Sequence, residues 1–157
     1  MTDPAKGSPS HGLFVKETSA ILASLGRRAE KLVTALNTLE GVTCNPAKGA
    51  MYAFPKITLP KHAIDAAKAE GKRLNISFEP DELYCREILI DGKVCLVPGS
   101  GFRQVDGTYH FRTTFLPSED DMAAYIAAIR KAHARFLQRY SRPNAIPLTW
   151  APTKARL

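Results

Sequence analysis

Apolar residues recur every three or four positions in two long stretches of the chain. The first stretch runs from about Thr18 to Leu39, with apolar residues at Ile21, Leu25, Ala29, Leu32, Leu36 and Leu39. The second follows Pro117 and has apolar residues at Met122, Tyr125, Ile126, Ile129, His133, Phe136, Leu137 and Tyr140. This spacing predicts two long amphipathic helices, each with one face towards a core.

The second of these helices also has clear end signals. Ser118 followed by Asp121 resembles a capping box, acidic residues fill the first turn, and Arg135 and Arg139 lie near the other end. His133 lies within the apolar stripe, which favours a hydrogen-bonded core histidine over a catalytic base.

Between the helices the pattern changes to a period of two. From Tyr109 to Phe115 large and polar residues alternate, which predicts a strand. One face carries His110, Arg112 and Thr114, and the opposite face carries Tyr109, Phe111, Thr113 and Phe115. A short apolar strand, Lys93 to Val97, precedes it and is stopped by Pro98 and the Gly99-Ser100-Gly101 segment.

The remaining elements are shorter. The pattern predicts an edge strand at 42–44 after Gly41 ends the first helix, a strand at 50–57, a helix at 61–70 ended by Gly71, a loop at 72–78 and a helix at 81–89. The fold class expected is therefore α+β, with a small, mostly antiparallel sheet flanked by two long helices.

Composition is compatible with one globular domain. The chain has 157 residues, of which 45% are hydrophobic and 24% are charged. No apolar run approaches the ~20 residues that a membrane-spanning helix needs. The first residues lack the apolar segment of a secretory signal, so a cytoplasmic location is expected.

The charge distribution does not indicate a nucleic-acid-binding site, and the cysteine spacing does not indicate a metal site. The net charge is +7, of which three positive charges lie in residues 141–157, and the rest are scattered, so nucleic-acid binding is a weak alternative. The three cysteines, Cys44, Cys85 and Cys95, have no metal-ligand spacing, and the four histidines form no close pair. Reduced structural thiols are expected, with no metal site.

Arg112 is the best candidate for a functional residue. Its strand is anchored by aromatic residues, so its guanidinium can face a cavity and bind a carboxylate through two parallel hydrogen bonds. An arginine on a half-buried strand is more often a sheet-surface or salt-bridging residue, and the pattern alone does not decide between the two readings.

Several longer segments carry a family resemblance. These are GAMYAFP at Gly49–Pro55, the pair Tyr84-Cys85, VPGSGF at Val97–Phe102 and GTYHFRTTFLP at Gly107–Pro117. In one register from about Phe14 to Tyr140, the chain resembles the C-terminal part of the alanine aminotransferases, which are pyridoxal-phosphate enzymes of fold type I. The resemblance implies the small domain of such an enzyme at 14–140, with a flexible lead-in at 1–13 and an irregular basic tail at 141–157.

The resemblance also implies roles for particular residues. Arg112 occupies the position of the arginine that binds the α-carboxylate in the reaction of L-alanine with 2-oxoglutarate to give pyruvate and L-glutamate. Gly99, Ser100 and Gly101 would form a tight loop beside the substrate cavity. A phosphate cradle is excluded, because a strand rather than a helix follows. Tyr52 and Phe54 would pack in the small-domain core, and Arg103 stands where the family usually has glycine.

Essential parts of the family enzyme are not matched in this sequence. No lysine lies in the serine-rich signature of the Schiff-base lysine, and the cofactor-binding large domain lies upstream of the matched region. We therefore expect no catalytic residue in this chain, no pyridoxal phosphate bound to it alone and no transamination by it alone. The partner expected is the missing large domain or a second copy, paired through the Leu25, Leu32, Leu36 and Leu39 side of the first helix.

A second hypothesis stays open. The chain could instead be a stand-alone, non-catalytic domain that binds a protein partner or a carboxylate ligand. A contiguous upstream large domain with its lysine would favour the enzyme, whereas a true start at Met1 would favour the second hypothesis.

Overall fold

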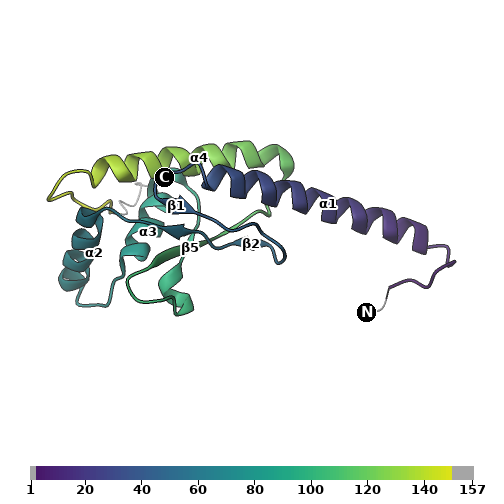
Figure 1. Ribbon diagram of the computed structural model, residues 1–157, viewed down its shortest axis with the longest axis horizontal. Coiled ribbons are helices and arrows are strands. Elements are labelled where there is room, and N and C mark those ends of the chain that lie inside the picture. The colour runs from purple at the N-terminus through teal and green to yellow at the C-terminus, as the bar shows by residue number, and fades with distance from the viewer. Residues whose placement is uncertain (1–2, 150–157) are drawn as a thin grey trace, which may run out of the picture.

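The computed structural model describes residues 3–149, within which helices cover a small antiparallel sheet (Figure 1). The helices are α1 (His11–Leu36), α2 (Lys61–Leu74), α3 (Pro80–Gly92), the 3-10 helix η1 (Gly99–Phe102) and α4 (Glu119–Arg139). The strands are β1 (Val42–Thr43), β2 (Tyr52–Ala53), β3 (Lys56–Ile57), β4 (Val97–Pro98) and β5 (Tyr109–Thr114). The α+β fold class expected from the sequence is confirmed.

Strand β5 is the centre of the sheet. β3 pairs with its first residues and β2 with its last residues, in one antiparallel register, and β4 pairs with Phe111 and Arg112. β1 extends the sheet by pairing with β3. The expected strand at 50–57 is therefore one extended segment along β5, divided at Phe54 and Pro55. The Pro55 carbonyl still accepts a hydrogen bond from the Phe111 amide, at 3.1 Å.

The two faces of β5 differ as the alternation predicted. Phe111 and Thr113 are buried, and the Thr113 hydroxyl is 2.7 Å from the Tyr125 hydroxyl of α4. His110, Arg112 and Thr114 are half-buried on the other face. The strand is thus held by its inner side chains while its outer face carries Arg112.

Helix α4 covers one side of the core. Its buried side chains are Met122, Ile129, Ala132, His133 and Phe136. The Ser118 hydroxyl accepts a hydrogen bond from the Asp121 amide at 3.1 Å, as the capping pattern predicted.

His133 is the hydrogen-bonded core histidine that the apolar stripe predicted. Its Nε2 donates to the Glu40 carbonyl at 3.0 Å, so its Nδ1 accepts from the Tyr84 hydroxyl at 3.1 Å. Burial lowers the pKa of His133, which favours this neutral form.

Helix α1 begins earlier and ends earlier than expected. It starts at His11, so residues 11–17 are helical, including the end of the segment expected to be a flexible lead-in. It ends at Leu36 because the Asn37 side chain forms two hydrogen bonds with the Cys44 backbone, at 2.8 and 2.9 Å. These bonds turn the chain towards β1, which a helix continuing to Leu39 would prevent.

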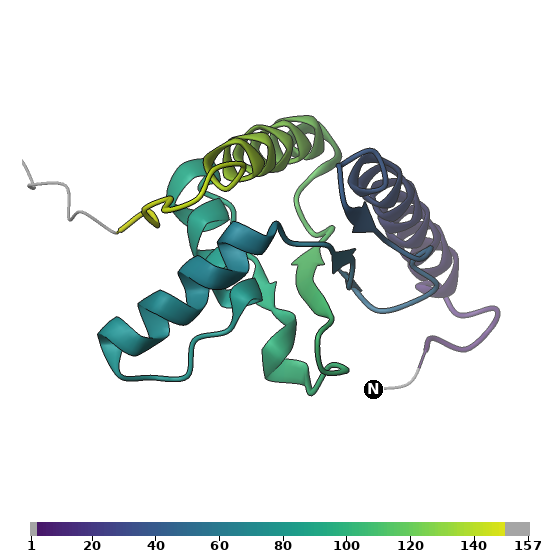
Figure 2. The same cartoon turned by 60° about the vertical axis from the view of Figure 1, so that its left-hand side comes forward.

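The apolar face expected to pair two copies is covered within this chain. Leu32 and Leu36 are buried against α4, which runs beside α1 (Figure 2), and Leu25 and Leu39 are partly buried. The expectation of pairing through this face is therefore wrong. The N-terminal half of α1 projects past α4 instead (Figure 1). The large apolar side chains of α1 that remain exposed are Leu13, Val15, Ile21 and Leu22.

Three other element boundaries also differ from the expectations. α2 continues through Gly71 to Leu74, because Gly71 allows close approach of the following loop: an added Cβ would lie 3.0 Å from the Ile76 carbonyl oxygen. α3 includes Pro80 and extends to Gly92. β4 is confined to Val97–Pro98, although Val94 and Leu96 before it are buried.

The chain after α4 is held by one buried carboxylate. Glu87 of α3 accepts hydrogen bonds from Arg139 Nη1 at 2.6 Å, from the Tyr140 hydroxyl at 2.5 Å and from the Leu148 amide at 3.0 Å. Residues 141–149 contain no helix or strand, and the remainder of the tail lies outside the described residues.

Candidate functional site

Arg112 lies in the middle of β5, opposite Val97 of β4. Its side chain is on the outer face of the sheet and is half-buried. Across residues 3–149 no carboxylate pairs with it, and no side chain or carbonyl accepts a hydrogen bond from its guanidinium. The sequence left open that Arg112 is a salt-bridging residue, but it forms no salt bridge with any residue that the structure describes.

Aromatic rings take the place of an acidic partner. The Arg112 Cζ lies 4.6 Å from the centre of the Tyr52 ring and 4.9 Å from the centre of the Phe102 ring. Both are cation–π contacts. No residue that the structure describes accepts a hydrogen bond from its N–H groups, whose planar arrangement matches an acceptor such as a carboxylate.

Tyr52 and Phe54 are not the core residues that the sequence interpretation made them. Tyr52 is 43% exposed and Phe54 is 44% exposed, on the same face as Arg112. The reason is strand parity, because Ala53 and Ile57 of the same segment take the inward positions. The alternation of Tyr52, Ala53 and Phe54 carries this signal in the sequence, whereas the core position was implied by the family resemblance.

The aromatic residues contact one another as well as Arg112. The Phe54 ring meets the Phe102 ring edge-on at 5.5 Å and stacks on the His110 ring at 5.2 Å. Burial and the nearby Lys56 ammonium lower the pKa of His110, against the opposing effect of Asp81. We call Tyr52, Phe54, Phe102, His110 and Arg112 the Arg112 cluster.

The glycine segment Gly99-Ser100-Gly101 forms η1 together with Phe102. A short loop and then β5 follow it, and Phe102 at its end is one of the two rings that contact Arg112. Beside it is a cavity of about 300 Å³ lined by Glu79, Ser100, Arg103, Gln104, Asp106 and Tyr109, among others.

Arg103 ends η1 in the left-handed conformation, with φ of 54°. Glycine adopts this conformation without steric cost, and glycine is what the resembled family usually has at this position. The Arg103 side chain is exposed and makes no hydrogen bond with any residue that the structure describes. It borders the 300 Å³ cavity.

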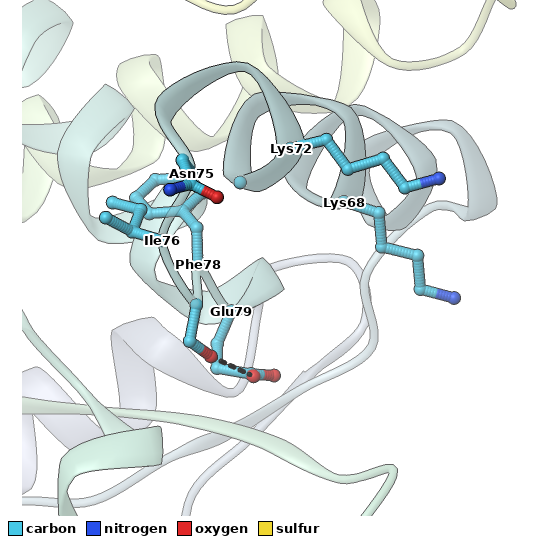
Figure 3. Close-up of a pocket in the computed structure, with 8 residues that line it drawn as sticks. Lys68, Lys72, Asn75, Ile76, Phe78 and Glu79 are labelled. Carbon is cyan, nitrogen blue, oxygen red and sulfur yellow. Dashed lines mark hydrogen bonds between the residues drawn. The ribbon is translucent and has the colours of Figure 1, made fainter.

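A larger cavity than this one lies elsewhere, at the C-terminal end of α2. It is an open cleft of about 540 Å³, lined by Lys68, Lys72, Asn75, Ile76, Phe78 and Glu79 among others (Figure 3). The two lysine side chains extend away from the loop that carries Asn75 and Phe78 (Figure 3). No residue of the Arg112 cluster lines this cleft.

Other kinds of site find no support within residues 3–149. No group of three or more histidine, cysteine or acidic side chains there could hold a metal ion. Cys44, Cys85 and Cys95 are free thiols, and burial raises the pKa of Cys85. None of the described helices is both long enough and apolar enough to span a membrane.

Comparison with known proteins relates the sequence to aminotransferases. No family model matches the chain. The chain is 46% identical over 138 residues to the alanine aminotransferase 2-like protein of Danio rerio, covering 88% of this chain and 24% of that protein. It is 50% identical over 137 residues to the probable mitochondrial alanine aminotransferase of Dictyostelium discoideum, covering 87% of this chain and 24% of that protein. The chain thus spans about a quarter of the length of these relatives.

Solved structures agree in fold. The alanine aminotransferase of Pyrococcus furiosus matches with a TM-score of 0.57 and 24% identity, over 74% of this chain and 25% of that one. An aminotransferase of Escherichia coli matches with a TM-score of 0.53 and 30% identity, over 76% of this chain and 25% of that one. The resemblance found in the sequence is confirmed by these matches.

These relatives contradict the expected cytoplasmic location. The Dictyostelium protein and two alanine aminotransferases of Arabidopsis thaliana are named as mitochondrial. The expectation had rested on the absence of a secretory signal, which carries no information about other compartments.

Proposed function

Because this chain is homologous to the alanine aminotransferases over 88% of its length, we propose that it is the C-terminal small domain of such an enzyme. The reaction of that enzyme would be L-alanine and 2-oxoglutarate to pyruvate and L-glutamate. In it, Arg112 would bind the α-carboxylate that all four of these compounds share.

The observation that carries this proposal is the unpaired guanidinium of Arg112. A half-buried cation that contacts two aromatic rings and has no acidic partner in the described chain suits an anionic ligand. The planar guanidinium matches a carboxylate through two parallel hydrogen bonds, which fixes the orientation of the substrate as well as its charge. The role of Arg112 is thus binding and orientation, not proton transfer.

The described residues do not by themselves fit pyridoxal phosphate. An imine-forming lysine needs a desolvated setting that favours its neutral amine, yet every lysine from Lys6 to Lys131 is exposed. We therefore assign no step of the transfer to this chain alone, and we propose that it needs the rest of the enzyme for catalysis.

The first test is a titration of the chain with pyruvate, monitored by NMR signals of the Arg112 side chain and of the β5 amides. We expect binding in the millimolar range, on the order of −4 kcal/mol, because one ion pair on an open surface supplies little more. The shifts should be centred on Phe111, Arg112 and Thr113. Arg112→Gln should abolish them, because the amide keeps a polar group but loses the charge and the paired donors.

Arg103→Ala is the matched control for the pyruvate titration. It removes a neighbouring exposed arginine whose side chain forms no hydrogen bond with a described residue, so the affinity should stay within about twofold, as for other exposed surface charges. Equal shifts in the Arg112→Gln variant, or binding that depends on Arg103, would contradict the assignment of Arg112.

The second test concerns the competence of the isolated chain. After incubation with pyridoxal phosphate and reduction with borohydride, mass spectrometry should find only scattered, substoichiometric adducts, because the exposed lysines are alike in their access to solvent. L-alanine and 2-oxoglutarate should show no turnover. A single stoichiometric adduct at one lysine, together with turnover, would refute this expectation.

The alternative of a stand-alone binding domain has one observation in its favour. The exposed apolar residues of the N-terminal half of α1, Leu13, Ile21 and Leu22, suit contact with a protein partner. Joining this chain to an upstream large domain, in trans or as one polypeptide, discriminates between the two. Restored transamination would support the enzyme, and its failure with a folded, associated complex would favour the alternative.

A further inference from the structure

We propose that Asp81 is a positioning residue for the Arg112 cluster: it fixes η1 so that the Phe102 ring lies over the Arg112 guanidinium. This inference rests on the function proposed for Arg112. It concerns a residue of α3, which belongs to neither the glycine segment nor β5.

Asp81 is fully buried in the first turn of α3. Its Oδ2 accepts hydrogen bonds from the Ser100 amide at 2.7 Å and from Gln104 Nε2 at 3.0 Å. These donors lie on either side of Phe102, so one carboxylate oxygen holds both ends of the turn that presents this ring.

The Asp81 carboxylate also orients a second ring of the cluster, His110, through the side chain of Gln104. Because Gln104 donates its amide nitrogen to Asp81, its Oε1 is left to accept from His110 Nδ1, at 3.0 Å. This bond places the imidazole proton on Nδ1 and sets the plane of the ring. The His110 ring stacks on Phe54, and Phe54 meets Phe102 edge-on. Both hydrogen-bonded paths from Asp81 therefore end at rings of the Arg112 cluster.

The space between η1 and β5 leaves no freedom for another arrangement. A Cβ added to Gly99 would lie 2.7 Å from the His110 Cβ and closer still to Gln104 Oε1. The turn is thus packed directly against the Asp81, Gln104 and His110 side chains. A change in their hydrogen bonds has to move η1, and Phe102 with it.

A contribution to the stability of the fold does not explain why a carboxylate is buried at position 81. Asp81 forms none of the salt bridges of residues 3–149, and its Oδ1 has no hydrogen-bond partner within them. Burial of a carboxylate without a cation costs several kcal/mol in general, although the N-terminus of α3 offsets a part. A buried group that costs stability and holds a loop over the binding residue is what a positioning role requires.

The experiment compares Asp81→Ala with Asp81→Asn in the whole chain. Two quantities are measured: the chemical shift of the Arg112 Nε–H group, which reports the ring currents of Tyr52 and Phe102, and the affinity for pyruvate. In Asp81→Ala the Arg112 resonance should move and pyruvate should bind about fivefold more weakly, the effect of losing one cation–π contact. Asp81→Asn should remain within about twofold of the original affinity, because its amide oxygen keeps both acceptor bonds while its nitrogen occupies the place of Oδ1.

Glu87→Gln is the matched control, because Glu87 is also a buried carboxylate of α3 but faces the tail rather than η1. It should lower stability without changing the Arg112 resonance or the pyruvate affinity. If Asp81→Ala does not fold, Gln104→Ala tests the same link from a partly exposed position and should move the Arg112 resonance in the same direction. An unchanged Arg112 resonance in a folded Asp81→Ala or Gln104→Ala variant, or an equal effect of Glu87→Gln, overturns the inference.

Failure of the proposed function would look different. If the original chain itself binds no pyruvate, the carboxylate-binding role of Arg112 is refuted. The comparison of the Arg112 resonance between the original chain and Asp81→Ala still decides whether Asp81 positions Phe102, since this measurement needs no ligand.

Discussion

Replacing Leu32 with glutamate is expected to unfold the chain. Leu32 is fully buried between α1 and α4, beside Leu36 and Ile129. The substitution loses the packing of a buried leucine, worth about 2–5 kcal/mol, and adds the cost of burying a polar or charged group. Because domains are stable by only about 5–15 kcal/mol, the folded state should not survive. Circular dichroism and amide NMR dispersion measure this directly.

Leu22→Glu is the control that separates folding from association. Leu22 is on the same helix but 63% exposed, so the free energy of unfolding should change by no more than about 0.5 kcal/mol. Self-association, if it uses the exposed apolar residues of α1, should decrease in this variant in sedimentation over a range of concentrations. A folded, monomeric Leu32→Glu variant would contradict the packing of α1 on α4. Association that is unchanged by Leu22→Glu would contradict the use of this surface.

Glu87→Ala is expected to cost about 3–5 kcal/mol, because a buried carboxylate that accepts three hydrogen bonds, one of them from the partly exposed Arg139, is lost. Its carboxylate is 1% exposed and accepts from Arg139, Tyr140 and the Leu148 amide, so three donors lose their acceptor together. Urea denaturation measures the loss. Hydrogen exchange of the Leu148 amide should become faster as residues 141–149 lose their attachment to α3.

Asp91→Asn is the control for Glu87→Ala, because it weakens another ion pair between the same two helices. Asp91 and Arg135 are 2.6 Å apart, but their side chains are 20% and 47% exposed. A partly exposed pair of this kind contributes about 1 kcal/mol or less. A loss from Glu87→Ala no larger than that from Asp91→Asn would show that Glu87 does not hold the tail.

Helix α4 and strand β5 could be predicted from the sequence because their signals are local. Ser118 and Asp121 form the cap that their spacing indicated, and His133 lies in the apolar stripe as a core histidine. Alternation along β5 placed Phe111 inside and Arg112 outside, as the structure has them. The cap joins residues three apart, and periodicity carries the face on which a side chain lies. The partners of His133, Tyr84 and Glu40, lie far away in the chain and could not be read from its position in the stripe.

The candidate site was only partly predictable. Arg112 was identified from its strand and from the family resemblance, whereas its pairing with Val97 is known only from the structure. Asp81 was not identified, because it lies 31 residues from Arg112 and acts through Ser100 and Gln104. Its only signal was its place in the first turn of a helix, where an acid is common for reasons unrelated to function.

The sequence by itself determined which side chains share a face: the stripe of α1, the stripe of α4 and the two faces of the 52–57 segment. Only the tertiary structure decided which of these faces is covered and by what. Arg28 of α1 donates to the Leu116 and Pro117 carbonyls, and Arg27 pairs with Glu119, so α4 begins over the middle of α1 and leaves Leu22 uncovered. Likewise, the meeting of η1 with β2 on one face of β5 turned exposed aromatic residues into the surroundings of Arg112. Periodicity is a property of neighbours in the chain, whereas burial depends on segments up to 90 or so residues apart that meet only when the chain folds.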